Sequence, residues 1–178
     1  MEIDKRRKAI QSWLESSNSP IKGNQLAEKF DVSRQVIVQD IALLRAAGTQ
    51  VVATPSGYLI QNIPSHGILK TICCLHNENL EEIKMELESI ISYGGRVIDT
   101  VVEHPVYGEI RVVLNLTCLN DIQSFLEKIE TSQAKLLSTL TEGVHYHTLE
   151  VPNEIVFEKI VEELKEKEIL KIESSKET

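Results

Sequence analysis

One segment indicates the fold of the N-terminal third, Val32-Ser33-Arg34-Gln35-Val36-Ile37-Val38-Gln39-Asp40-Ile41. Ser33 is a favourable N-cap for a helix that we expect to run to about Ala47. Within this helix, apolar residues recur at the spacing of a single helix face, so we expect a core beneath Ile37, Ile41 and Leu44. On the face opposite Ile37 and Ile41 lie Arg34, Gln35, Val38, Gln39 and Ala42, and this face is expected to be wet.

The surrounding sequence extends this helix into a recognisable unit. Two helical patterns precede it, at about residues 4–16 and 22–30, and a tight turn separates the second from Ser33. A β-hairpin follows over residues 51–60, with its turn at Pro55-Ser56-Gly57. This order of elements is typical of a winged helix-turn-helix, so residues 1–62 are predicted to be a DNA-binding domain.

The exposed face of the third helix carries side chains that can read bases. Arginine pairs with guanine and glutamine with adenine, while an apolar side chain suits the thymine methyl group. Small polar groups on the hairpin suit phosphate contacts. We expect DNA contacts from Ser33, Arg34, Gln35, Val38 and Gln39 on the helix and from Thr54, Ser56 and Tyr58 on the hairpin, with added charge from Lys5, Arg6 and Arg7. A three-helix protein-interaction module with solvated polar faces is the alternative.

The charge distribution supports a division into two parts. The 178-residue chain has a net charge of −8, but residues 1–62 hold eight basic and six acidic residues, a net of +2. The other 116 residues hold 11 basic and 21 acidic residues, a net of −10. Such asymmetry indicates two different tasks. Residues 61–67 are rich in turn-forming residues and are the expected junction.

Composition excludes several classes of protein. Hydrophobic residues make up 42% of the chain, enough for a folded core and too many for wholesale disorder. No apolar run approaches the roughly 18 residues of a membrane helix, and the basic start has no apolar segment behind it, so no signal peptide is expected. Three cysteines argue against a disulfide framework and for a cytoplasmic protein.

The C-terminal part, residues 68–174, alternates between strand and helix patterns. Strands are predicted at residues 69–75, 96–103, 107–116, 144–151 and 169–172, and helices at about 80–93, 121–131 and after the capping residue Asn153. The order βαββαβαβ indicates an α+β sandwich, with helices on one face of a largely antiparallel sheet.

Histidines suggest chemistry in this second part. His145 and His147 are two residues apart on a predicted strand, so both imidazoles lie on one face. With His76 and Glu86 they would suit Zn²⁺, Ni²⁺ or Fe²⁺, although an exposed pair of histidines without a metal is as common a pattern. Cys73 and Cys74 point to opposite faces, so at most one reaches a pocket near His76. We expect all three cysteines, Cys118 included, to be small core residues.

Two longer motifs in this part carry a family resemblance. They are Glu103-His104-Pro105-Val106-Tyr107-Gly108-Glu109 and Leu137-Ser138-Thr139-Leu140-Thr141-Glu142-Gly143-Val144-His145-Tyr146-His147-Thr148. Both closely resemble signatures of the three-histidine domain, and the helix-turn-helix segment resembles the one that accompanies it. Over about residues 4–172 the chain is therefore similar to niacin-responsive transcriptional repressors of NAD biosynthesis and niacin uptake genes.

The resemblance implies a set of site residues. A divalent ion (Ni²⁺, Zn²⁺ or Fe²⁺) is expected on His76, Glu86, His145 and His147, with Glu82 as the alternative carboxylate. Nicotinic acid is expected as the co-repressor, and its pyridine nitrogen could ligate the metal. Arg96, Arg111 or backbone N–H groups could hold its carboxylate. His104 and Tyr107 belong to the first motif and are expected near the pocket.

Three functional hypotheses compete. The first is a repressor controlled by nicotinic acid, which would act as a homodimer on operator DNA because one winged domain contacts too little DNA for specific binding. The second is a transcription factor that senses the metal itself. The third is a metal-dependent enzyme with Glu103 or Glu109 as general base; it leaves the helix-turn-helix unexplained, and we do not expect an enzyme.

Overall fold

The computed structural model describes residues 3–60, 67–77, 79–132 and 134–171. The chain divides into two compact units, Met1–Pro64 and Ser65–Thr178, with the division inside the turn-rich stretch singled out from the sequence. None of the helices in these described ranges is both long enough and apolar enough to cross a membrane.

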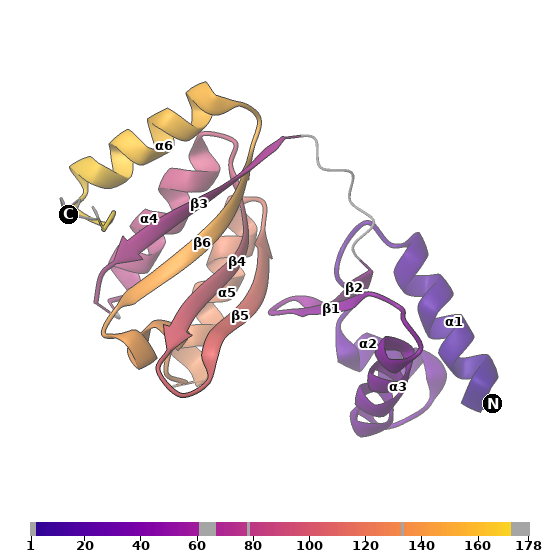
Figure 1. Ribbon diagram of the computed structural model, residues 1–178. Helices are drawn as coiled ribbons and strands as arrows, with labels where there is room; N and C mark the ends of the chain where they lie inside the picture. Colours follow the sequence, from indigo (N-terminus) through magenta and orange to yellow (C-terminus); the bar gives the residue numbers. More distant parts are fainter. Residues whose placement is uncertain (1–2, 61–66, 78, 133, 172–178) are drawn as a thin grey trace. The chain divides into compact units, whose positions relative to one another are not determined.

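The N-terminal unit is three helices and a hairpin, in the predicted order (Figure 1). Its elements are α1 (Ile3–Ser16), α2 (Gly23–Phe30), α3 (Arg34–Ala46), β1 (Val51–Thr54) and β2 (Gly57–Ile60). Ser33 caps α3, because its hydroxyl accepts a hydrogen bond from the Val36 N–H at 3.3 Å. The apolar residues predicted to face inward do so, and the core contains Ile10, Leu14, Leu26, Ile37, Ile41 and Leu44.

The hairpin is attached to the chain segment that precedes α2. The backbone groups of Ile21 and Tyr58 exchange two hydrogen bonds of 2.8 Å. This close approach requires glycine at position 57, where φ is +141° and a Cβ would lie 2.4 Å from the carbonyl oxygen of Ile21. Gly57 thereby allows the hairpin to pack closely against the segment before α2.

A charged pair lies within this small core. Asp40 on α3 is only 2% exposed, and its carboxylate accepts a hydrogen bond of 2.7 Å from Nε of Arg6 on α1. The sequence placed Arg6 in a basic group with Lys5 and Arg7, available to DNA. The structure instead uses Arg6 to neutralise a buried carboxylate, and Arg7 pairs with Asp4.

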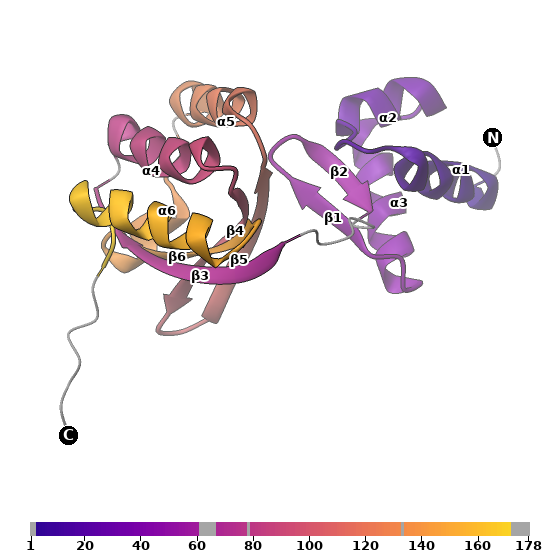
Figure 2. The same cartoon turned by 90° about the horizontal axis from the view of Figure 1, so that it is seen from above.

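The C-terminal unit is a two-layer α+β sandwich, as predicted. A four-stranded antiparallel sheet in the order β3-β6-β4-β5 is covered on one face by three helices (Figure 2). The elements are β3 (Ile68–Leu75), α4 (Leu80–Ser92), β4 (Arg96–His104), β5 (Gly108–Leu116), α5 (Leu119–Ser132), the 3-10 helix η1 (Leu137–Thr141), β6 (Val144–Val151) and α6 (Glu154–Glu166).

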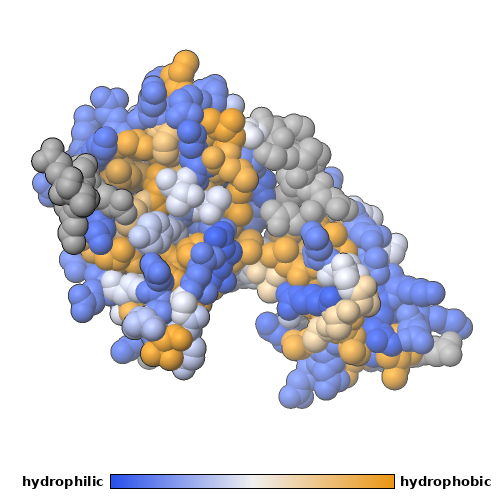
Figure 3. All heavy atoms as spheres, viewed as in Figure 1, coloured by the Kyte–Doolittle hydropathy of each residue, from blue (hydrophilic) through white to orange (hydrophobic). Residues whose placement is uncertain are grey.

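The core of this unit lies between the sheet and the helices, where Leu87, Ile122, Leu149, Ile160 and Leu164 are almost fully buried. None of the described helices of this unit lies on the other face of the sheet, which is turned toward the viewer in Figure 3 and carries both apolar and hydrophilic residues. The period of two along each strand thus separates a core face from a mixed face.

The predicted closing strand at residues 169–172 is reduced to one bridge between Leu170 and Cys74. The chain leaves α6 through Glu168, whose φ is +57°, and only a short stretch then reaches the edge of β3. Residue 172 lies outside the described ranges. The 3-10 helix η1 was not predicted, because its short Leu-Ser-Thr-Leu-Thr sequence has no helical period.

We expect Asp40→Ala to destabilise the N-terminal unit by about 3 kcal/mol, because it leaves the Arg6 charge without a partner in a largely buried position. Urea unfolding followed by fluorescence measures this unit, since Trp13 is the single tryptophan of the chain. The control is Asp4→Ala, which removes an exposed pair and should cost less than about 1 kcal/mol. Equal losses in the two variants would contradict a structural role for the Arg6–Asp40 pair.

Candidate metal centre and nucleic-acid interface

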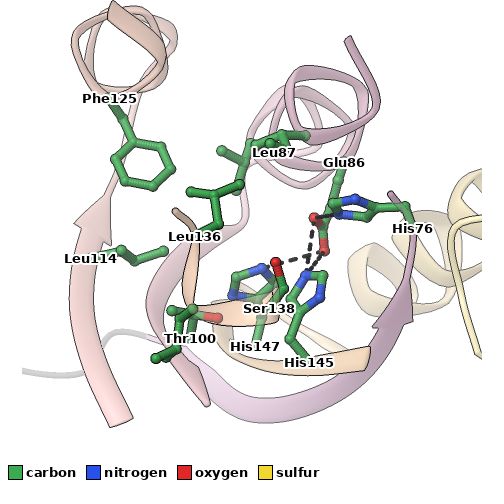
Figure 4. Close-up of a pocket in the computed structure, with 12 residues that line it drawn as sticks. His76, Glu86, Leu87, Thr100, Leu114, Phe125, Leu136, Ser138, His145 and His147 are labelled. Atoms are coloured by element: carbon green, nitrogen blue, oxygen red, sulfur yellow. Dashed lines mark hydrogen bonds and ion pairs between the residues drawn. The ribbon is translucent and has the colours of Figure 1, made fainter. Parts of the chain in front are cut away.

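The four residues predicted as metal ligands converge inside the C-terminal unit (Figure 4). His76 follows the end of β3, Glu86 lies on α4, and both His145 and His147 are on β6. Glu86 is 1% exposed, and His145 and His147 are 4% and 3% exposed. Because β6 is a central strand and α4 covers this face of the sheet, the two imidazoles of β6 point toward Glu86.

The Glu86 carboxylate lies among the three imidazoles. Its Oε2 is 2.7 Å from Nε2 of His76, and its Oε1 is 3.3 Å from Nε2 of His145 and 3.3 Å from Nε2 of His147. Successive rings are nearly perpendicular, with centroids 4.9 Å apart for His76 and His145 and 5.0 Å apart for His145 and His147. The three Nε2 atoms therefore approach one carboxylate from different directions.

The second nitrogen of each ring is held by a backbone carbonyl. The contacts join Nδ1 of His76 to Asn77 O (2.7 Å), Nδ1 of His145 to Gly143 O (2.9 Å) and Nδ1 of His147 to Asp99 O (2.7 Å). A carbonyl can only accept, so each Nδ1 carries a proton and donates it. In the neutral rings, each Nε2 then presents a lone pair to the site, which is how metal-binding histidines are usually held.

A glycine lets two of these segments lie side by side. Gly143 has a φ of +89°, and a Cβ at this position would lie 2.3 Å from the carbonyl oxygen of His76. Any other residue would push the end of β3 away from the start of β6. Gly143 thus helps to set the positions of His76 and His145.

Charge in the cluster is balanced within the site. Burial alone would raise the pKa of the Glu86 carboxyl, but the three histidines hold that pKa well below its usual range. Burial alone would lower the pKa values of His147 and His76, but the Glu86 carboxylate raises both. Without a metal, the carboxylate requires protons on nearby Nε2 atoms. A divalent cation would supply the positive charge while leaving each Nε2 lone pair free to bind it.

This donor set therefore fits a divalent transition metal. Imidazole nitrogens and a carboxylate oxygen suit Zn²⁺, Ni²⁺ or Fe²⁺. The residues that would hold the ion are His76, Glu86, His145 and His147. The alternative carboxylate, Glu82, accepts a hydrogen bond of 3.0 Å from the Asn77 N–H, and its charge helps to raise the pKa of His76. Among the described residues, however, Glu86 is the carboxylate that contacts all three imidazoles. Glu86 faces inward because it lies on the same buried face of α4 as Ile83 and Ile90.

A small apolar cavity adjoins the cluster, with a volume of about 50 Å³. Its wall is formed mostly by aliphatic side chains and one aromatic ring, and its polar lining beyond the cluster consists of Thr100 and Ser138 (Figure 4). The apolar lining comprises Ile83, Leu87, Leu114, Phe125, Leu136 and Leu137. The site thus combines metal-binding groups with a surface that suits a small flat ring.

The other residues predicted near this pocket lie elsewhere. Arg96 donates to Glu150 and Asn115, and Arg111 pairs with Asp99 and Glu109. Both arginines reach the uncovered face of the sheet, because their partners alternate with the inward residues. His104 and Tyr107 stack on each other in the exposed β4–β5 turn, with centroids 4.9 Å apart. None of these four residues lines the cavity, so their role in ligand binding remains a prediction that this geometry does not favour.

Other residues at the site were missed or misplaced by sequence reasoning. Thr100 and Ser138 have no sequence pattern that distinguishes them from other hydroxyl residues, although Ser138 lies in the second motif. Cys74 is fully buried, as expected, but it faces the cluster. The expectation that Cys118 is a core residue is wrong, because Cys118 is exposed just before α5 begins.

The candidate nucleic-acid interface is the outer face of α3. Arg34, Gln35, Val38 and Gln39 are exposed, and Val38 keeps 48% of its surface accessible. The hydroxyl of Thr54 donates to the carbonyl oxygen of Gly57 at 3.0 Å, which orders the turn of the wing. Thr54, Ser56 and Tyr58 are half-buried there. The face is polar with one exposed valine, which suits base edges in a major groove.

Comparisons with known proteins match both units. The 3H domain family matches residues 69–173, and an HTH domain family matches residues 6–59. A probable transcription repressor NiaR of Thermotoga maritima is 46% identical over 165 residues, which is 93% of each chain. A transcription repressor NadR of Bacillus subtilis is 39% identical over 168 residues, covering 93% of this chain and 92% of that protein.

The two units together define a two-part regulator, in which a helix-turn-helix unit precedes an α+β unit. The chain belongs to the family of niacin-responsive transcriptional repressors, with an N-terminal helix-turn-helix and a C-terminal 3H domain. Its relatives and its helix-turn-helix identify it as a DNA-binding repressor.

The cluster predicts opposite effects of pH on metal-free stability and on metal binding. The raised pKa values of His76 and His147 mean that their protonated pairing with Glu86 stabilises the metal-free fold below about pH 6.5 and is lost as pH rises through the raised values. The lowered pKa of Glu86 means that its share is lost only when pH falls well below 4.5. Metal affinity should instead increase with pH, because the metal displaces these protons.

Urea unfolding of the chelator-treated protein and of its Glu86→Gln variant checks this prediction across a pH series. The stability advantage of the unaltered protein should be largest in mild acid and should shrink toward alkaline pH. An advantage that grows steadily from pH 5 to pH 9 would show that the cluster is not held by protonated histidines.

Proposed function

We propose that this protein represses genes of NAD biosynthesis and niacin uptake, with nicotinic acid as co-repressor and one divalent metal ion (Ni²⁺, Zn²⁺ or Fe²⁺) per subunit. The observation that carries the proposal is the buried cluster of His76, Glu86, His145 and His147 beside an apolar cavity, in a chain with a DNA-reading helix. The family resemblance supports the identity of the effector.

Nicotinic acid matches the chemistry of the cavity. It has a flat ring, a pyridine nitrogen that resembles imidazole as a ligand, and a carboxylate. When bound, the divalent ion would offer coordination positions beyond its protein ligands, which a pyridine nitrogen can fill. Leu114, Phe125 and Leu136 can contact the ring, and the hydroxyls of Thr100 and Ser138 are available to the carboxylate.

The cavity must enlarge before nicotinic acid can enter it. A volume of about 50 Å³ has room for roughly three to five water molecules, which is less than nicotinic acid needs. Phe125 and Leu136 are only partly buried, so their side chains are the ones expected to move when the ligand enters. Ligand binding would then shift the side chains that α5 and the residue before η1 contribute to the cavity wall.

Nicotinic acid can control DNA binding only if both ligands shift the same conformational equilibrium of the protein. Nicotinic acid that strengthens operator binding must itself bind more tightly to the DNA complex, with a coupling typically of about 1–3 kcal/mol. We propose a homodimer, because two recognition helices can read two half-sites of an operator. A cytoplasmic protein fits this task.

The alternatives differ in what they need from the cavity. A metal sensor would use the same ligands and need no organic effector. An enzyme would need a general base at the metal, but Glu103 and Glu109 line a depression on the uncovered face of the sheet with Arg111 and Tyr146. Among the described residues that line the cavity, the only carboxylate is Glu86, which is already engaged by the histidines.

Fluorescence anisotropy of a labelled promoter fragment from a niacin-uptake or NAD-biosynthesis gene tests the proposal at fixed salt. Nicotinic acid should tighten binding about 5- to 150-fold, nicotinamide should not, and chelation should abolish the effect. The variant His145→Ala/His147→Ala should lose the response, while His104→Ala, in the exposed turn, should keep it. Tightening by metal alone would favour the metal sensor, and a full response of the double variant would refute the assigned site.

Arg34→Ala should weaken operator binding by about 1–3 kcal/mol and relax the preference at one base position. The reason is that an exposed arginine at the start of α3 can pair with a guanine edge. Titrations against a set of singly substituted operators measure both effects. Lys159→Ala on α6, which removes an equally exposed charge from the other unit, is the control and should leave affinity nearly unchanged. A uniform loss over all operators would assign Arg34 to phosphate contact instead.

A further inference from the structure

A thiol lies next to the candidate metal ligands. Cys74 is 0% exposed, and its Cα is directly opposite that of His145 in the pairing of β3 with β6. Its Sγ, a carboxylate oxygen of Glu86 and a ring nitrogen of His145 all lie within 4.8 Å of one another. Cys74 therefore reaches the cluster from the strand that leads to His76.

Strand geometry separates this thiol from its neighbour. Cys73 is opposite Tyr146 in the same pairing, and its side chain points to the other face of the sheet. The pair Cys73–Cys74 thus places one sulfur at the cluster and one away from it, which gives a matched internal control.

We propose that Cys74 is a sulfur ligand of the metal ion at this site, in addition to Glu86 and the histidines. The inference rests on the metal site of the proposed function. Ligands on opposite sides of one ion are about 4.4 Å apart when one is sulfur and the other nitrogen. The separations among the Cys74 Sγ, a Glu86 oxygen and a His145 nitrogen are at most 4.8 Å, an upper bound slightly above this spacing.

A purely structural thiol is the competing explanation, since Cys74 also belongs to the core that includes Ile72 and Leu87. The location favours a ligand, because the sulfur is next to a carboxylate and an imidazole and not only among apolar groups. A thiolate beside Glu86 would be unfavourable in the absence of a cation. On metal binding the S–H bond breaks, its proton goes to the solvent, and the Sγ–metal bond forms.

A sulfur ligand has a consequence for metal selectivity. Thiolate is a soft ligand, whereas carboxylate and water favour hard ions such as Mn²⁺ and Mg²⁺. Cys74 should therefore shift the preference of the site toward Zn²⁺, Co²⁺ and Ni²⁺. Removing the thiol should weaken Zn²⁺ binding and have little effect on Mn²⁺.

Cobalt spectroscopy of the full-length protein tests the proposal, with one equivalent of Co²⁺ added to the metal-free protein. The unaltered protein and Cys73→Ala should show a near-ultraviolet sulfur-to-cobalt charge-transfer band. Cys74→Ala should lose this band and keep the visible d–d bands of cobalt bound by nitrogen and oxygen. Competition titrations should show Zn²⁺ affinity reduced by at least about 10-fold in Cys74→Ala, with Mn²⁺ affinity nearly constant.

The outcomes separate this inference from the proposed function. Visible cobalt bands without a charge-transfer band in the unaltered protein would overturn sulfur ligation and leave the metal site intact. No cobalt bands at all would overturn both. A band that survives in Cys74→Ala but not in Cys118→Ala would assign the sulfur to exposed Cys118 and overturn the proposal.

A further measurement covers the case in which Cys74→Ala does not fold. X-ray absorption of the zinc-loaded Cys73→Ala/Cys118→Ala protein, in which Cys74 is the only remaining cysteine, should show one sulfur scatterer at about 2.3 Å. A shell of nitrogen and oxygen alone would refute the proposal.

Discussion

The buried carboxylate of Glu86 is the constraint on which the C-terminal unit depends. A charge removed from water is costly unless it is paired and hydrogen-bonded. Here the partners are three imidazoles from two chain segments about 70 residues apart, and they meet Glu86 only because β3 and β6 pair in one register. A slip of one residue in β6 would turn both of its histidines to the uncovered face. The pairing register of β3 and β6 therefore also fixes which side chains meet at Glu86.

The backbone around the cluster also helps to position the histidines. The register of β4 shifts between Val97 and Asp99, and this irregularity directs the carbonyl of Asp99 to Nδ1 of His147. The side chain of Asp99 meanwhile accepts the N–H of Thr148 at 3.1 Å and pairs with Arg111. One residue thus orients a candidate ligand through its main chain and ties two strands together through its side chain. The sequence suggested that Arg111 could hold a ligand carboxylate, but in the structure its guanidinium pairs with Asp99.

The N-terminal unit must form a core while leaving one face of α3 exposed. Its three helices are short, and its core must be built without using the face of α3 that would meet DNA. The inward face of α3 consists of Ile37, Ile41 and Leu44. A hydrogen-bonded ion pair between Arg6 and Asp40 also joins α1 to α3. The outer face can then remain polar, with Val38 as its exposed apolar exception. The net charge of +2 on residues 1–62, against −10 on the rest of the chain, agrees with a DNA-binding role for the first unit.

The sequence by itself indicated the order of the main helices and strands, the division into two units and a short set of candidate ligands, because helix and strand periods are local and the family motifs are specific. The pairing of His145 with His147 followed from the period of two alone. Only the tertiary structure decided that Glu86 and not Glu82 joins them, that Cys74 faces the cluster while Cys73 does not, and that Arg96, Arg111, His104 and Tyr107 lie away from it. The closing strand became a single bridge for a similar reason. Each of these outcomes depends on which segments, distant in the chain, come to lie together, and no local pattern of side chains encodes that.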